Sequence, residues 1–149
     1  MNNIENIVKS VATKSKKDIS IFKEIKQMDF VDIFPRSEVE RIKLNNDAIK
    51  LGVVIEKTDR GVVYKLNNPI KTILGEILLV KIRKYDSSRL SWECAGDFIV
   101  DDFEKFKEQH KDSPNCKFVV GKTYTAIEIK TENSLSYVMD IPTSQFYNI

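Results

Sequence analysis

A strand pattern passes directly into a helix pattern over residues 92–106, which read WECAGDFIVDDFEKF. Aromatic, β-branched and small residues up to Val100 predict a strand, because such side chains suit a pleated, half-buried surface. Asp101 predicts the N-cap of the helix that follows, with Glu104 three residues later. The residues that we expect on the inner face of this helix, from their helical spacing, are Phe103, Phe106 and His110.

Three further strands follow this helix, and the same order of elements occurs earlier in the chain. Residues 29–34 predict a strand, and Ser37 with Glu40 forms a capping box that begins a helix. Gly52 predicts the end of that helix. The apolar positions expected on its buried face are Val39, Ile42 and Ile49. The strands predicted after the two helices cover residues 53–56, 62–66, 75–83, 117–120, 126–130 and 135–141.

The repeated order predicts an α+β protein made of two βαβββ modules in tandem, at about residues 29–86 and 90–142. We expect these modules to form a single domain over residues 29–149. Residues 1–28 carry apolar side chains at helical spacing and predict an N-terminal extension of one or two helices. If there are two, the polar run around Lys14 separates them, and Asp18 caps the second, which runs to Met28.

Composition narrows the class of protein. The chain has 149 residues, of which 42% are hydrophobic and 31% charged, as in an ordinary globular protein. Its 24 Lys and Arg nearly balance 22 Asp and Glu, so the net charge of +2 argues against a nucleic-acid partner. There is neither a signal-peptide pattern nor a run of about 18 apolar residues, so we expect a cytoplasmic protein without a membrane partner.

Over roughly residues 29–142, the arrangement resembles the vicinal oxygen chelate superfamily, which includes glyoxalase I, bleomycin-resistance proteins and extradiol dioxygenases. The resemblance is carried by residues 96–106, where a strand runs into an Asp-Asp helix cap, and by residues 131–138, TENSLSYV, before the last strand. At this second place the family usually has an Asp-Pro-Asp-Gly turn, which is absent here. The resemblance implies two curved sheets that enclose a ligand cleft.

Enzymes of this superfamily bind a divalent metal through His and Glu side chains at four strand positions. By resemblance these positions fall on Phe30, Leu79, Ala95 and Val138, and none of these side chains can coordinate a metal. The chain's own residues also argue against a metal site of this kind, because its one imidazole, that of His110, belongs to a predicted helix. We therefore expect no metal and no other cofactor.

Alternation along the strands predicts which side chains face the cleft. Val31 and Ile33 share the face that packs under helices, which leaves Phe30, Asp32 and Phe34 opposite. In the second module Glu93 and Asp97 point the same way, so Asp32 and Asp97 occupy equivalent places. On the strand 75–83, Lys81 and Arg83 share the parity of the cleft. The predicted ligand-binding residues are Phe30, Asp32, Phe34, Arg83, Glu93 and Asp97.

Three functions fit these residues. The leading hypothesis is a metal-free protein that binds a small organic ligand in the cleft. The alternative is a metal-independent isomerase or lyase that uses Asp32 or Asp97 as a general base, because two close carboxylates raise the pKa of one of them. The third is a protein–protein interaction module that uses the N-terminal helices. A purely structural role for these charges, as ion pairs at an open sheet, also remains. We expect a monomer or a homodimer.

Overall fold

The computed structural model describes residues 3–89, 94–131 and 135–149. Within these ranges the chain is an α+β protein whose eight strands form one mixed sheet. The strands are β1 (Gln27–Ile33), β2 (Gly52–Thr58), β3 (Gly61–Thr72), β4 (Gly75–Arg83), β5 (Cys94–Ile99), β6 (Cys116–Val120), β7 (Thr125–Lys130) and β8 (Leu135–Met139). The helices are α1 (Asn3–Asp18), α2 (Glu38–Leu51), α3 (Phe103–His110) and α4 (Thr143–Phe146), with a 3₁₀ turn η1 (Ser87–Arg89).

The strands lie in the order β2-β3-β4-β1-β5-β8-β7-β6. In the N-terminal half β1 pairs with β4 in parallel, and in the C-terminal half β5 pairs with β8 in parallel. The antiparallel pair β1–β5 joins the two halves at the centre. The expectation of two separate sheets that enclose a cleft is therefore wrong. The strands form one continuous sheet, because β1 and β5 hydrogen-bond to each other.

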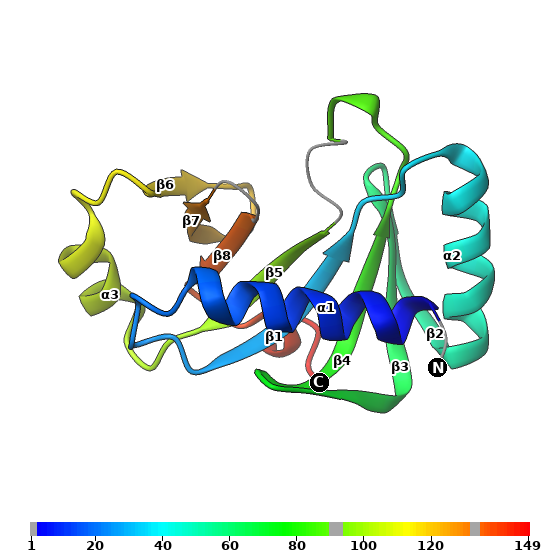
Figure 1. The fold of residues 1–149 in the computed structure, drawn as a ribbon, viewed down its shortest axis with the longest axis horizontal. Coiled ribbons are helices and arrows are strands. Elements are labelled where there is room, and N and C mark those ends of the chain that lie inside the picture. Colours follow the sequence, from blue (N-terminus) through cyan, green and yellow to red (C-terminus); the bar gives the residue numbers. More distant parts are fainter. Residues whose placement is uncertain (1–2, 90–93, 132–134) are drawn as a thin grey trace.

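One face of the sheet carries the main hydrophobic core. Figure 1 shows α1 running across this face, with α2 at one end of the sheet and α3 at the other. Ile4 and Val8 of α1 are fully buried there, as are Val31 of β1 and Phe98 of β5. The N-terminal helix thus belongs to the same core as the sheet. None of the helices described is long and apolar enough to span a membrane.

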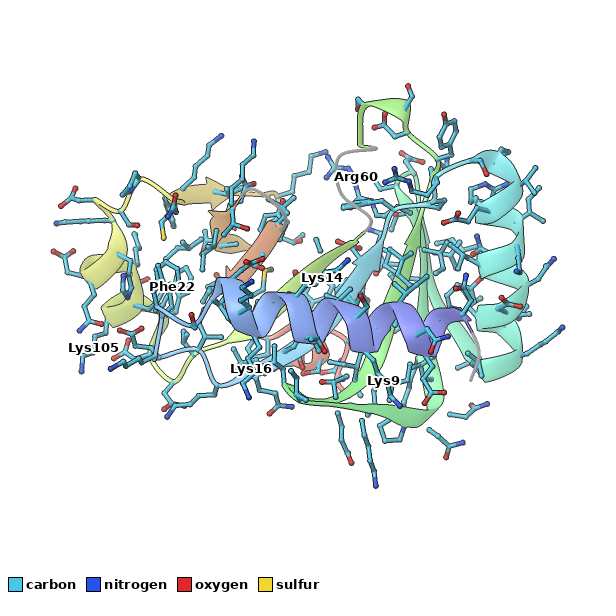
Figure 2. The ribbon with its side chains drawn as sticks, viewed as in Figure 1. Lys9, Lys14, Lys16, Phe22, Arg60 and Lys105 are labelled. Carbon is cyan, nitrogen blue, oxygen red and sulfur yellow. The ribbon has the colours of Figure 1, made fainter. Side chains whose placement is uncertain are left out.

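The prediction of a second N-terminal helix, up to Met28, is wrong. Residues 19–26 form turns, and β1 begins at Gln27. The apolar side chains that suggested helical spacing serve different partners. Phe22 packs against Phe106 of α3 with ring centroids 5.9 Å apart, and Figure 2 shows Phe22 between α1 and α3. Met28 is buried within β1, which must be extended to pair with its neighbours.

The predicted inner face of α2 is also wrong. Val39, Ile42 and Ile49 are 79%, 50% and 61% exposed, whereas Leu44 and Ala48 are fully buried. The hydroxyl of Tyr64, on β3, donates a hydrogen bond of 2.7 Å to Oδ1 of Asn45 and so helps to set this rotation of the helix.

Both ends of α2 lie where the sequence predicts them. The backbone N–H of Glu40 donates to Oγ of Ser37, which confirms the N-cap. Gly52 follows the last helical residue and begins β2 at once. A Cβ at Gly52 would collide with the carbonyl oxygen of Lys65, so glycine allows the two strands to approach.

The helix of the second half is capped one residue later than predicted. The side chain of Asp102, rather than that of Asp101, accepts from the backbone N–H of Lys105 across 3.0 Å. The inner face is as expected, because Phe106 is buried and the ring of His110 packs against it, with centroids 4.5 Å apart and the ring planes tilted by 48°. His110 is a packed residue of this helix, with its Nε2 3.2 Å from Glu24.

Candidate functional site

A pocket of about 370 Å³ opens on the sheet face opposite α1. Its floor is built from the central strands β1, β4, β5 and β8, and the C-terminal segment around α4 forms a wall. All the predicted site residues that the structure describes line this pocket: Phe30, Asp32, Phe34, Arg83 and Asp97. Glu93 and its neighbour Trp92 lie outside the described residues, as do residues 132–134 of the second family-like segment.

Strand register explains why these side chains converge. Phe30 of β1 lies opposite Asp97 of β5, and Asp32 lies opposite Lys81 of the parallel strand β4. Because side chains alternate along a strand, Val31 points away into the main core. The predicted division of β1 and β5 into a core face and a pocket face is therefore confirmed.

Asp97 is the most enclosed charged group of the pocket. It is 9% exposed, and Thr143, the first residue of α4, donates its hydroxyl to Oδ2 of Asp97 across 2.9 Å. Burial raises the pKa of Asp97 well above its usual 3.8, and the negative charge of Asp32 raises this pKa further. The Thr143 hydrogen bond and Lys81 lower it in part. Asp97 therefore favours the protonated form more than an exposed carboxyl group does.

Asp32 keeps an ionic partner. Nη1 of Arg83 lies 3.7 Å from Oδ2 of Asp32, and the Arg83 guanidinium lies 5.4 Å from the ring centroid of Phe34. Arg83 and Phe34 also line an adjoining cavity of about 430 Å³, together with Arg60 and Lys84. Arg60 lies at the tip of the β2–β3 hairpin (Figure 2). The pocket thus continues into a cavity lined by charged side chains of both signs, because Asp59 and Asp86 line it as well.

Sequence reasoning missed several pocket residues. Lys81 has the parity of the cleft but is not among the predicted ligand-binding residues. Its half-buried side chain lines the pocket. Tyr147 and Thr143 lie beyond the last predicted strand, which ends at residue 141. Burial and a hydrogen bond to Glu56 raise the pKa of the Tyr147 hydroxyl. No local pattern marks these C-terminal residues, because only chain packing brings them over the sheet.

The family-derived metal positions need one correction. Val138 lies in the main core on the other side of the sheet, whereas its neighbours Tyr137 and Met139 line the pocket. The position at β8 that the resemblance implies therefore does not face the pocket, because adjacent residues of a strand point to opposite sides. Among the described residues, no group of three or more His, Cys, Asp or Glu side chains could hold a metal ion.

Comparison with known proteins informs the fold alone. No family model matches the chain, and no curated protein matches it. A solved structure described as "Structural Genomics, Protein EC4020" superposes with a TM-score of 0.67, over 99% of this chain and 96% of that chain. The two sequences are 8% identical, so this similarity concerns the α+β architecture.

Proposed function

We propose that this chain is a metal-free small-molecule-binding protein with the tandem arrangement of the vicinal oxygen chelate superfamily. The strand order supports the arrangement, because each half has its first strand beside its last one in parallel, and the two first strands meet at the centre. The observation that carries the function is the convergence of residues from both halves on one pocket, with Asp32 and Arg83 from one half and Asp97 from the other.

The lining suits an organic molecule with an apolar body and a charged end. Aromatic side chains of Phe30, Phe34 and Phe146 supply apolar contact area. Arg83 presents a planar fork of donors that suits a carboxylate or phosphate, and Arg60 lies on the same side, in the adjoining cavity. A pocket of this kind binds by shape and orients its ligand by a few polar contacts.

Native mass spectrometry of the protein purified from cells tests this proposal. We expect a stoichiometric organic mass that is released on denaturation. In Arg83→Glu this mass should be lost, because the pocket cation becomes an anion. Lys50→Glu makes a similar charge change at an exposed position of α2, outside the pocket, and should retain it. Absence of a bound mass, or its retention in Arg83→Glu, would contradict the proposal.

A metal-independent isomerase or lyase is the second candidate, and the enclosure of Asp97 favours it. A carboxyl group whose pKa is raised by burial is a stronger base than an exposed one and can take up and return a proton during a reaction. The released molecule, incubated with the protein in D₂O, should then exchange a C–H proton in its NMR spectrum. Asp97→Asn should abolish this exchange and leave binding measurable. Unchanged exchange in Asp97→Asn would eliminate Asp97 as the base.

A further inference from the structure

Lys81 lines the pocket from β4 and has no close ionic partner among the residues that the structure describes. It projects from β4, opposite Asp32 in the register, and its side chain is half-buried. Among the described residues, no carboxylate oxygen lies within 4.0 Å of its ammonium group, whereas Arg83 on the same strand is paired with Asp32. The ammonium group of this half-buried lysine is therefore available to a ligand in the pocket.

The surroundings of Lys81 favour the neutral amine more than a surface position does. Burial lowers the pKa of Lys81 below its usual 10.5, and the positive charges of Arg83 and Arg60 lower it further. The negative charges of Asp32 and Glu56 raise this pKa, but they only partly offset the lowering. A neutral amine is a nucleophile that attacks carbonyl carbon.

A proton donor for the reaction lies in the same pocket. The pKa of Asp97 is raised, for the reasons given above, and the positive charge of Lys81 is one of the groups that act on this pKa. Thr143 holds Oδ2 of Asp97 by a hydrogen bond and so fixes the orientation of the carboxyl group. Lys81 and Asp97 therefore combine a nucleophile with an acid, and Arg83 offers a contact for an anionic group.

We propose that Lys81 forms a Schiff base with a carbonyl compound that carries a carboxylate or phosphate group on an apolar body. This inference rests on the proposed function, because the compound occupies the same pocket. The Nζ lone pair forms a C–N bond as the carbonyl π bond breaks, and a proton moves from nitrogen to oxygen to give a carbinolamine. The nitrogen lone pair then expels the hydroxyl group, which takes a proton from Asp97 and leaves as water. The iminium ion that results gives its N–H proton to the Asp97 carboxylate, which leaves a neutral imine, and no oxidant or reductant is needed.

Trapping with 4-carboxybenzaldehyde tests the proposal. The full-length protein is incubated with this aldehyde and sodium cyanoborohydride, which reduces an imine to a stable amine, and the modified lysine is located by peptide mass spectrometry. We expect Lys81 to be modified faster than the other lysines. Arg83→Gln should slow modification of Lys81 by about tenfold, because a charge-assisted hydrogen bond to the carboxylate is lost.

Matched variants separate the pocket lysine from a general loss of structure. Lys81→Arg should abolish the fast modification, whereas Lys71→Arg, at an exposed position of β3, should leave it unchanged. Mapping the adduct in the unaltered protein gives the same information if Lys81→Arg fails to fold. Modification spread evenly over surface lysines, or none at Lys81, would overturn the proposal.

A ligand that lacks the aldehyde group and keeps the carboxylate distinguishes this inference from the proposed function. We expect 4-(hydroxymethyl)benzoate, which cannot form an imine, to bind and to slow modification of Lys81 by competition. Binding of this alcohol together with an unmodified Lys81 would reject the Schiff base and leave the binding function standing. Modification of Lys81 that the alcohol does not slow would contradict recognition of the carboxylate in this pocket and so overturn the proposal in its stated form.

Discussion

Thr143 donates its hydroxyl to Oδ2 of Asp97 across 2.9 Å, although the two residues are 46 positions apart in the sequence. Beside this bond, the backbone N–H of Ser144 donates to Oδ2 of Asp29 across 2.9 Å. Two strands of the sheet, β1 and β5, thus hold the start of α4. The C-terminal segment becomes a wall of the pocket through these contacts, and the pKa of Asp97 depends on them in turn.

Replacing Thr143 by Val keeps the shape of the side chain and removes the hydrogen bond. We expect the free energy of unfolding to fall by about 1 kcal/mol, because a buried carboxyl oxygen loses its partner. Urea denaturation measures this change. Thr13→Val, at an exposed position of α1, is the control and should change stability by less than about 0.5 kcal/mol. Equal stability of Thr143→Val and the unaltered protein would show that the bond does not hold α4.

The raised pKa of Asp97 predicts a dependence of stability on pH. Because the folded-state pKa lies above the unfolded one, the folded protein binds the proton more tightly. The stabilisation is complete below the unfolded pKa of about 3.9 and is lost as pH rises through the folded pKa. Asp97→Asn carries no charge at any pH, so relative to the unaltered protein it should gain stability between pH 4 and neutral pH, by about 1.4 kcal/mol for each unit of the shift.

Denaturation of both proteins at a series of pH values checks this prediction. The difference between their free energies of unfolding should be smallest in acid and grow towards neutral pH. A difference that stays constant over the series would mean that Asp97 has the same pKa in the folded and unfolded chains.

The burial of α1 predicts that this helix is necessary for the fold. Ile4 is fully buried in the main core, so Ile4→Ala should lower the free energy of unfolding by about 2–5 kcal/mol. Ile21 is 68% exposed, and Ile21→Ala should cost less than about 0.5 kcal/mol. Chemical denaturation of the two variants provides the measurement. A small effect of Ile4→Ala would support a separable helix, as the interaction-module hypothesis requires.

The rotation of α2 is open to the same kind of comparison. Leu44→Ala should lower the free energy of unfolding by about 2–5 kcal/mol, because Leu44 is fully buried. Ile42→Ala, at a position 50% exposed, should have a much smaller effect. Thermal and urea denaturation compare them. A larger loss of stability in Ile42→Ala than in Leu44→Ala would instead support the buried face that the spacing of Val39, Ile42 and Ile49 suggests.

Strand alternation alone predicts most of the side chains that face the pocket. From Phe30 onward, beyond the irregularity between Met28 and Phe30, the apolar Val31 and Ile33 indicate which side of β1 faces the helices. Phe30, Asp32 and Phe34 then had to point the other way, and the equivalent position in β5 is Asp97. At β8 the position taken from the family resemblance, Val138, lies in the main core, whereas Tyr137 and Met139 line the pocket.

Helix faces were less predictable, because apolar residues occur on more than one side of α2. Ile42 and Ile49 compete with Leu44 and Ala48, and their spacing alone does not show which stripe meets β3. Similarly, Phe22 and Met28 suggested one helix although they contact different partners, α3 and the centre of the sheet. Periodicity reports that side chains are apolar, and only packing selects those that are buried.

The sequence by itself determined the order of the elements, the N-cap at Ser37 and the face of β1 and β5 on which the carboxylates lie. These features are local, because they depend on alternation, capping and turn residues within a few positions. The pairing of β1 with β5, the closure of the pocket by Thr143 and Tyr147, and the enclosure of Lys81 were decided only by the tertiary structure. They require contacts between distant segments, whose free energy comes from burial and hydrogen bonding that no short stretch of sequence encodes.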